Sequence, residues 1–184
     1  MSVRFEPVTG RYMRLDLLGK PHRVYIEEAG DPGNIPLLCL HTAGADTRQY
    51  RGVMNDERVL QHYRVIAFDM PWHGKSLPPK DFYLMEDEYK LTTKFYAEFI
   101  VAFCHALDLK KPVIMGQSMG GNICLELALR YENEFSALIA LEACDYSPGW
   151  WIVALHHPHI HGNEVVATST FGLMSPESPD EHRW

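Results

Sequence analysis

Hydrophobic and polar residues alternate along two stretches near the start of the chain, within YMRLDLLGKPHRVYIEEAGD at residues 12–31. Alternation with a period of two is typical of strands that bury one face. Between the two stretches stands Gly-Lys-Pro at residues 19–21, a combination that favours a turn. The pattern therefore predicts a β-hairpin over residues 12–31.

Four later runs are continuously apolar instead of alternating. They occupy residues 35–41, 63–70, 113–116 and 136–144. Continuous apolar runs of this length are typical of strands that are buried on both faces of a parallel sheet.

Between these runs the apolar residues recur at a spacing of about four. The spacing is clearest over residues 86–107, which it predicts to be an amphipathic helix. The apolar stripe of this helix consists of Leu91, Phe95, Phe99, Phe103 and Leu107. Helices are also predicted over residues 48–63 and 118–131. Strands that alternate with helices predict an α/β fold, with a mostly parallel sheet and helices on both of its faces.

The alternation of strands and helices stops after Cys144. The residues that follow are rich in Trp, His and Pro and show no periodic pattern. We therefore predict two parts, a core with the sheet over residues 1–145 and a separate segment over residues 146–184 that leaves the sheet.

Composition and charge exclude several classes of protein. A formal charge of −7 at pH 7 disfavours nucleic acid as a partner, because phosphate binding needs a basic surface. No apolar run reaches the roughly 18 residues of a membrane span, and the opening MSVRFEPVTG has no apolar signal core. The four cysteines are widely spaced, as is typical of free buried thiols in a reducing compartment. We therefore expect a cytoplasmic protein without a membrane partner.

The segment Gly-Gln-Ser-Met-Gly at residues 116–120 matches the nucleophile-elbow pattern G-x-S-x-G. An apolar strand is predicted before it and a helix after it, which is the context that this motif requires. Gly116 and Gly120 lack the Cβ atoms that would clash across so sharp a turn. Ser118 is the candidate nucleophile, and the Met119 N–H would stand at a helix N-terminus that favours negative charge. The alternative is a glycine-rich turn that binds phosphate, but the pattern G-x-x-x-x-G-K-[ST] is absent.

Two loops follow predicted strands and support this site. In HTAGAD at residues 41–46, small side chains would let a backbone N–H approach a substrate carbonyl oxygen. The alternative for this loop is an ordinary connection in which Asp46 or Thr47 caps the next helix. In FDMPWHGKS at residues 68–76, Asp69 ends a strand and is predicted to hold the loop in place.

Taken together, the three motifs resemble the α/β-hydrolase fold superfamily over roughly residues 12–145. The resemblance implies that Ser118 is the nucleophile and that the Met119 and Ala43 N–H groups form the oxyanion hole. Thr42 stands where the family usually has Gly, and we expect it to face the substrate. Because some members carry Asp at the elbow, Ser118 favours esterases, thioesterases, C–C bond hydrolases or cofactor-free perhydrolases.

The catalytic acid would follow the nucleophile in the chain. In many members of the superfamily it follows the seventh strand, whereas the strands predicted here number six. Glu142 resembles an acid that some members place after the sixth strand, and Asp145 is its neighbour. The alternative for Glu142 is a carboxylate that caps a turn or pairs with a surface cation.

No histidine after Ser118 is a convincing base. Most of these histidines lie in one cluster and the last stands near the end of the sequence: His156, His157, His159, His161 and His182. Imidazoles could bind a metal, but Pro158 interrupts helical spacing and no Cys or H-E-x-x-H pattern accompanies them. In the superfamily this stretch is where a cap or lid is inserted. We therefore expect lid packing, no metal and no cofactor, and we expect a further C-terminal segment to carry the base and complete the sheet.

These features predict a serine hydrolase that forms an acyl-enzyme at Ser118 with a small ester-like or other acyl substrate. Trp150 and Trp151 in the predicted lid indicate an apolar acyl or aromatic group. One alternative is a C–C bond hydrolase of the same fold. Another is a non-catalytic binding protein, which applies if the chain ends at residue 184.

Overall fold

The computed structural model describes residues 5–78 and 91–143. The chain divides into two units, Met1–Ala143 and Cys144–Trp184, and only the first contains described residues. The predicted lid over residues 146–184, including Trp150, Trp151 and the histidine cluster, lies outside the described residues.

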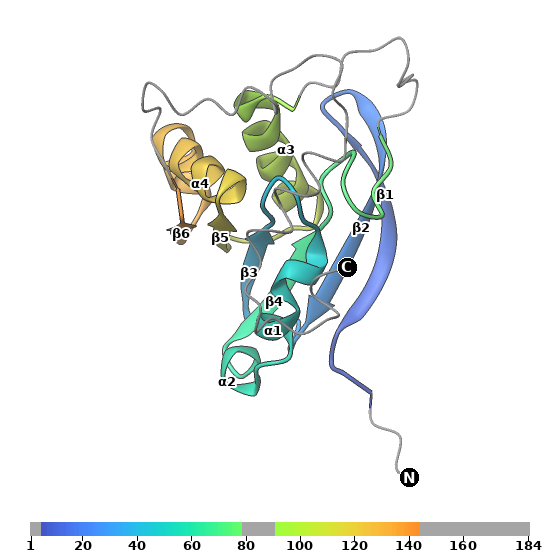
Figure 1. The fold of residues 1–184 in the computed structure, drawn as a ribbon. Helices are drawn as coiled ribbons and strands as arrows, with labels where there is room; N and C mark the ends of the chain where they lie inside the picture. Colours follow the sequence, from blue (N-terminus) through green and yellow to red (C-terminus); the bar gives the residue numbers. More distant parts are fainter. Residues whose placement is uncertain (1–4, 79–90, 144–184) are drawn as a thin grey trace. The chain divides into compact units, whose positions relative to one another are not determined.

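A six-stranded sheet forms the centre of the first unit, with the strand order β1-β2-β4-β3-β5-β6 (Figure 1). Its strands are β1 (Thr9–Leu17), β2 (Lys20–Ala29), β3 (Ile35–Leu40), β4 (Tyr63–Phe68), β5 (Val113–Gln117) and β6 (Ala137–Leu141). The predicted hairpin is confirmed as β1 and β2, and β2 pairs antiparallel with β4. The four apolar runs form β3 to β6, which pair in parallel. The predicted α/β class is therefore confirmed.

The helices agree with the sequence in part. They are η1 (Thr47–Tyr50), α1 (Arg51–Met54), α2 (Glu57–Leu60), α3 (Thr93–Ala106), α4 (Met119–Arg130) and η2 (Glu132–Glu134). The prediction of one helix over residues 48–63 is wrong, because the chain breaks it between α1 and α2. The Asp56 carboxylate accepts from the Arg58 N–H at 2.9 Å and starts a new helix there.

The amphipathic helix α3 begins later than the sequence pattern predicts. The Thr92 hydroxyl accepts from the Phe95 N–H at 3.1 Å and caps the helix, so that Thr93 is its first residue. The predicted start at residue 86 lies outside the described residues, but a continuous helix from there to residue 107 is excluded by this cap.

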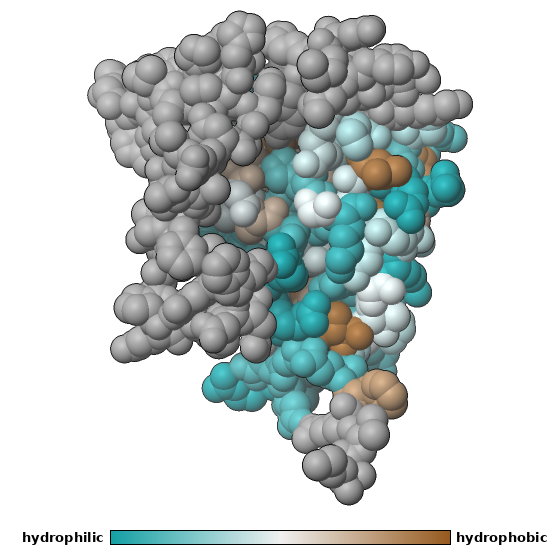
Figure 2. All heavy atoms as spheres, turned by 45° about the vertical axis from the view of Figure 1, so that its right-hand side comes forward, coloured by the Kyte–Doolittle hydropathy of each residue, from teal (hydrophilic) through white to brown (hydrophobic). Residues whose placement is uncertain are grey.

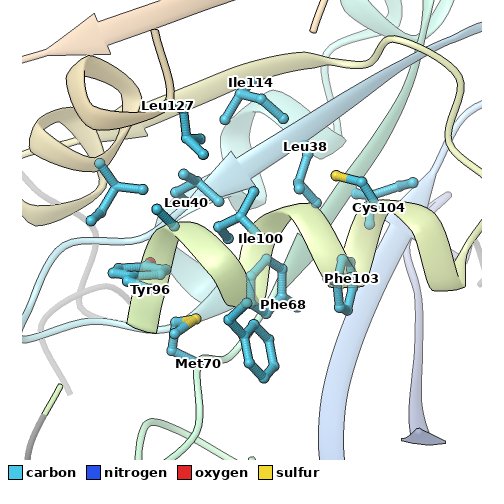
Figure 3. Packing of buried hydrophobic residues seen from close by; sticks show 14 of the residues in the cluster. Leu38, Leu40, Phe68, Met70, Tyr96, Ile100, Phe103, Cys104, Ile114 and Leu127 are labelled. Carbon is cyan, nitrogen blue, oxygen red and sulfur yellow. The ribbon is translucent and has the colours of Figure 1, made fainter. Parts of the chain in front are cut away.

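Side chains from the parallel strands form two cores, one on each face of the sheet. Helices α3 and α4 cover one face, where Figure 3 shows Ile100 and Leu127 packed with side chains of β3, β4 and β5. Strands β1 and β2 contribute Leu17, Val24 and Ile26 to this core, and the parallel strands contribute Leu38, Leu40, Ile66, Phe68 and Ile114. Tyr50 and Met54 cover the opposite face, against Leu37, Cys39 and Val65. The predicted helices on both faces are thus confirmed.

The surface of the described part is more polar than the two cores. On the face shown in Figure 2 it is mostly hydrophilic, with scattered hydrophobic residues. Cys39, Cys104 and Cys124 are buried and free, as predicted for these three thiols. Within the described residues, no helix combines the length and the apolar character needed to cross a membrane.

Candidate active site

Ser118 lies in the turn between β5 and α4, with φ of 54° and ψ of −111°. This left-handed backbone costs a residue other than glycine on the order of 1–3 kcal/mol, and such strain collects at functional sites. Two backbone hydrogen bonds hold the strained residue. The Ser118 N–H donates to the Leu141 carbonyl at 2.9 Å, and the Asn122 N–H donates to the Ser118 carbonyl at 2.8 Å. The predicted strand–turn–helix context of the serine is confirmed.

Glycines make this turn sterically feasible. A Cβ at Gly116 would lie 2.2 Å from the Gly120 carbonyl oxygen, and one at Gly120 would lie 2.3 Å from that of Leu40. A Cβ at Gly121 would lie 2.5 Å from the Leu141 carbonyl oxygen. Because these neighbours are backbone atoms, side chains at the three positions would push α4 away from the sheet.

The predicted oxyanion donors belong to two neighbouring strand ends. Strands β3 and β5 pair in parallel with Leu40 opposite Gly116. The loop after β3 and the elbow after β5 therefore lie side by side at the C-terminal ends of the strands. The Met119 N–H stands in the first turn of α4, where helix amides lack intrahelical partners and attract negative charge. Within the described part of the chain, neither this N–H nor that of Ala43 donates a hydrogen bond.

His41 holds the peptide group that contains the Ala43 N–H. Its Nδ1 lies 2.7 Å from the Thr42 carbonyl oxygen, and the Ala45 N–H donates to the same oxygen at 3.2 Å. Because a trans peptide points its C=O and N–H in opposite directions, fixing the Thr42 carbonyl also fixes the Ala43 N–H.

The tautomer of His41 follows from its partners. Its Nε2 accepts from the Met70 N–H at 3.1 Å, so the proton is on Nδ1. The side chain is 1% exposed, and burial lowers its pKa to about 4, which keeps the ring neutral at pH 7. The sequence placed His41 at a strand end, but it carried no signal for this positioning role.

Asp69 holds the loop after β4, as predicted. Its buried carboxylate accepts from the Thr47 N–H at 2.8 Å and from the Lys75 N–H at 2.7 Å. Burial raises the pKa of this carboxyl above its usual range. A Cβ at Gly74 would lie 2.2 Å from the carboxylate, which explains the glycine in this loop. Asp69 therefore ties the loop after β4 to the start of η1, and Asp46 caps η1 as the sequence allowed.

Glu142 lies beside the elbow. Gln117 of β5 is in register with Leu141 of β6, so Ser118 and Glu142 are the next residues on adjacent parallel strands. Glu142 also has a positive φ of 49°, which is uncommon for this residue type. The Gln117 Nε2 donates to its Oε2 at 2.5 Å. The structure thus brings the candidate nucleophile and the candidate acid together at the C-terminal ends of β5 and β6.

The other predicted residues are absent from this arrangement or lie outside it. From Ser118 to residue 143 the sequence contains no histidine, and the later histidines lie outside the described residues. His73, in the loop after β4, precedes Ser118 in the chain. Its Nδ1 lies 3.1 Å from the Pro71 carbonyl oxygen and its ring lies against that of His41. No cluster of three or more potential metal ligands occurs among the residues that the structure describes.

The strand order and the strained serine between β5 and α4 define an α/β protein with the strand–turn–helix geometry of the G-x-S-x-G motif. Comparison with known proteins agrees with this class. The family model described as alpha/beta hydrolase fold matches residues 35–175. The chain therefore belongs to the α/β hydrolase fold family.

Individual relatives share about 30% of their residues with this chain over the aligned part. The hydrolase YugF of Bacillus subtilis is 30% identical over 75% of this chain and 48% of its own length. The pimeloyl-[acyl-carrier protein] methyl ester esterase of Hamiltonella defensa is 30% identical over 65% of this chain and 41% of its own. The chain therefore spans less than half the length of these curated relatives.

Solved structures agree on the fold. A thermophilic esterase from Thermogutta terrifontis superimposes with a TM-score of 0.70 at 20% identity, over 88% of this chain and 58% of its own. At this identity the likeness concerns the fold alone.

Proposed function

We propose that the protein is a serine hydrolase that cleaves a small ester-like or other acyl substrate. The observation that carries this proposal is the strained backbone of Ser118 between β5 and α4. A serine with a positive φ between a strand and a helix is the arrangement that the nucleophile-elbow motif requires. The similarity to a methyl ester esterase supports an ester among the acyl substrates.

In the proposed reaction the Ser118 oxygen attacks the acyl carbonyl carbon and forms a tetrahedral intermediate. The Met119 and Ala43 N–H groups donate to its oxyanion. One such donor typically contributes about 2.7–4 kcal/mol to the transition state. Collapse of the intermediate expels the alcohol and leaves an acyl-enzyme at Ser118, which water then hydrolyses.

The proton from Ser118 has to go to a base. We propose that a histidine beyond residue 143 takes it and later returns it to the leaving group. Glu142 is the proposed acid that orients this histidine, because Gln117 occupies one carboxylate oxygen and the other can accept from an imidazole. A carboxylate further along the chain is the alternative acid.

The outermost strand β6 supports the proposal that a further segment completes the site. β6 pairs with β5 and is the last strand in the described sheet. Its Ile139 and Leu141 are 41% and 42% exposed, which is unusual for large apolar residues in a parallel sheet. A segment that pairs with β6 and also packs on this face would cover them. It would bring its own strand end, and hence the base, to the C-terminal ends of the strands, where Ser118 lies.

Two other features remain proposals. Thr42, Trp150 and Trp151 are proposed to line the substrate site with a lid over residues 146–184. A cytoplasmic location is supported by the three free buried cysteines.

Hydrolysis of p-nitrophenyl acetate by the full-length protein tests the function. Ser118→Ala is expected to lower kcat by more than about 1,000-fold, because the nucleophile is lost. Ser136→Ala is the matched control, since Ser136 is exposed and its described hydrogen bond uses only the backbone. Equal hydrolysis by wild type and Ser118→Ala would show that Ser118 is not the nucleophile. A folded wild type that does not turn over this or other acyl esters would favour a binding protein.

A further inference from the structure

Two glutamine side chains connect the oxyanion loop to the elbow in one line of hydrogen bonds. The Thr42 N–H donates to Gln49 Oε1 at 2.9 Å. Gln49 Nε2 donates to Gln117 Oε1 at 2.5 Å, and Gln117 Nε2 donates to Glu142 Oε2 at 2.5 Å. This amide chain, from Thr42 through Gln49 and Gln117 to Glu142, joins the ends of β3, β5 and β6 and the helix η1.

The direction of each hydrogen bond in the amide chain is fixed by its ends. A backbone N–H can only donate, so Gln49 must turn its oxygen to Thr42 and its nitrogen to Gln117. Gln117 must then offer its oxygen to Gln49 and its nitrogen to Glu142. An ionised carboxylate only accepts, so it can end the chain opposite the Gln117 nitrogen. Each glutamine is therefore held in one of its two amide orientations.

The amide chain acts on the peptide that precedes Thr42, whereas His41 and Ala45 hold the peptide that follows it. With both peptides fixed, the backbone dihedrals of Thr42 are fixed, and with them the direction of the Ala43 N–H. Before it ends at Glu142, the amide chain passes through Gln117, the residue directly before Ser118. The amide chain thus fixes the position of the Ala43 N–H relative to Ser118 as well as relative to β3.

We propose that Gln49 and Gln117 are positioning residues that hold the Ala43 N–H in place relative to Ser118. This inference rests on the proposed serine hydrolase function and extends it. The Thr42 side chain stands where a smaller residue is usual in this family, and the amide chain supplies the rigidity that keeps a donor aligned in such a loop. Neither glutamine touches the reacting atoms, so their effect is on the stabilisation of the transition state.

Gln49→Met and Gln117→Met remove the hydrogen bonds and keep the approximate length of the side chain. The exposed Gln61 at the end of α2 provides the matched control, Gln61→Met. We expect each site variant of the full-length protein to lower kcat for p-nitrophenyl acetate by about tenfold, with KM unchanged, because an oxyanion donor acts on the transition state. The double variant is expected to lose no more than either single variant, because one broken link already frees the loop.

Amide hydrogen exchange measures the loop independently of turnover. Exchange at Thr42 is expected to accelerate in Gln49→Met and in Gln117→Met, while Gln61→Met exchanges as wild type does. Faster exchange at Thr42 with an unchanged kcat would overturn the inference, because the amide chain would then be structural only. Losses that multiply in the double variant, or unchanged exchange at Thr42, would also overturn it. A folded wild type without Ser118-dependent turnover would instead reject the proposed function on which the inference rests.

Discussion

At the scale of single residues, the site depends on close approach of backbone to backbone. Gly120 lets α4 start against the Leu40 carbonyl, and this contact sets where Ser118 and Met119 stand. A methyl group at this position has no flexible neighbour to displace. The missing Cβ atoms of the glycines are therefore as necessary for this turn as the serine is for its proposed chemistry.

The Gly120→Ala substitution tests this close contact. Because the new Cβ would lie 2.3 Å from the Leu40 oxygen, the free energy of unfolding is expected to fall by about 1–3 kcal/mol. Gly52→Ala in α1 is the matched control. Its Cβ meets nothing within 4 Å, so helix propensity should leave stability unchanged or raise it by about 0.5–1 kcal/mol. Urea unfolding measures both, and equal effects would contradict the packing argument.

His41 makes the loop after β3 sensitive to acid. Its folded pKa of about 4 lies below the value of about 6.5 in an unfolded chain, so the unfolded state binds more protons between these values. The free energy of unfolding should therefore fall as pH decreases through this window, by about 2 kcal/mol between pH 7 and pH 5. Below about pH 4 this contribution is fully lost.

Urea unfolding at pH 7 and pH 5 checks this dependence on pH. The His41→Gln variant is expected to lose less stability than wild type over the same interval, because it has no imidazole to protonate. His22 is also buried with a lowered pKa and contributes in the same direction in both proteins. The same loss of stability in wild type and variant would show that His41 does not carry the effect.

Glu142→Gln separates two roles of one carboxylate. Glutamine retains an oxygen that can accept from Gln117, but it cannot stabilise a positively charged imidazole. If Glu142 orients the base, as proposed, kcat for p-nitrophenyl acetate is expected to fall by about 10,000-fold. A nearly unchanged kcat would place the catalytic acid further along the chain.

At the scale of elements, the strands could be located from the sequence because a strand that is buried on both faces consists of consecutive apolar residues. The helices were harder to bound, since their ends depend on single capping side chains. Asp56 divided the region predicted as one helix, and Thr92 delayed the start of α3. Periodicity alone does not register such caps.

The elbow could be predicted from sequence because its strand, glycines and serine are consecutive residues. The amide chain could not, since Gln49 and Gln117 are 68 positions apart and meet only through the parallel pairing of β3 with β5. His41 was missed for a similar reason, because its partner Met70 follows a different strand.

The cap of α3 can be tested at this scale. Thr92→Ala removes the acceptor for the Phe95 N–H, and the free energy of unfolding is expected to fall by about 1 kcal/mol. Thr92→Ser keeps the hydroxyl and should stay close to wild type in the same urea titration. If both variants unfold alike, the hydroxyl does not cap the helix.

At the scale of the whole molecule, the exposed apolar residues of β6 set the main expectation. If a further segment pairs with this strand in the full-length protein, the amides of Ala137–Leu141 that point away from β5 should exchange slowly with solvent hydrogen. Hydrogen exchange resolved by residue provides this measurement. Rapid exchange at those amides would show that β6 remains an open edge.

The most direct test of the whole account is where a fluorophosphonate probe attaches to the full-length protein. We expect one covalent adduct on the Ser118 oxygen, located by tandem mass spectrometry, and its loss in Ser118→Ala but not in Ser136→Ala. An adduct on another residue, or a folded protein that takes up no probe, would contradict the central claim that Ser118 is an activated nucleophile.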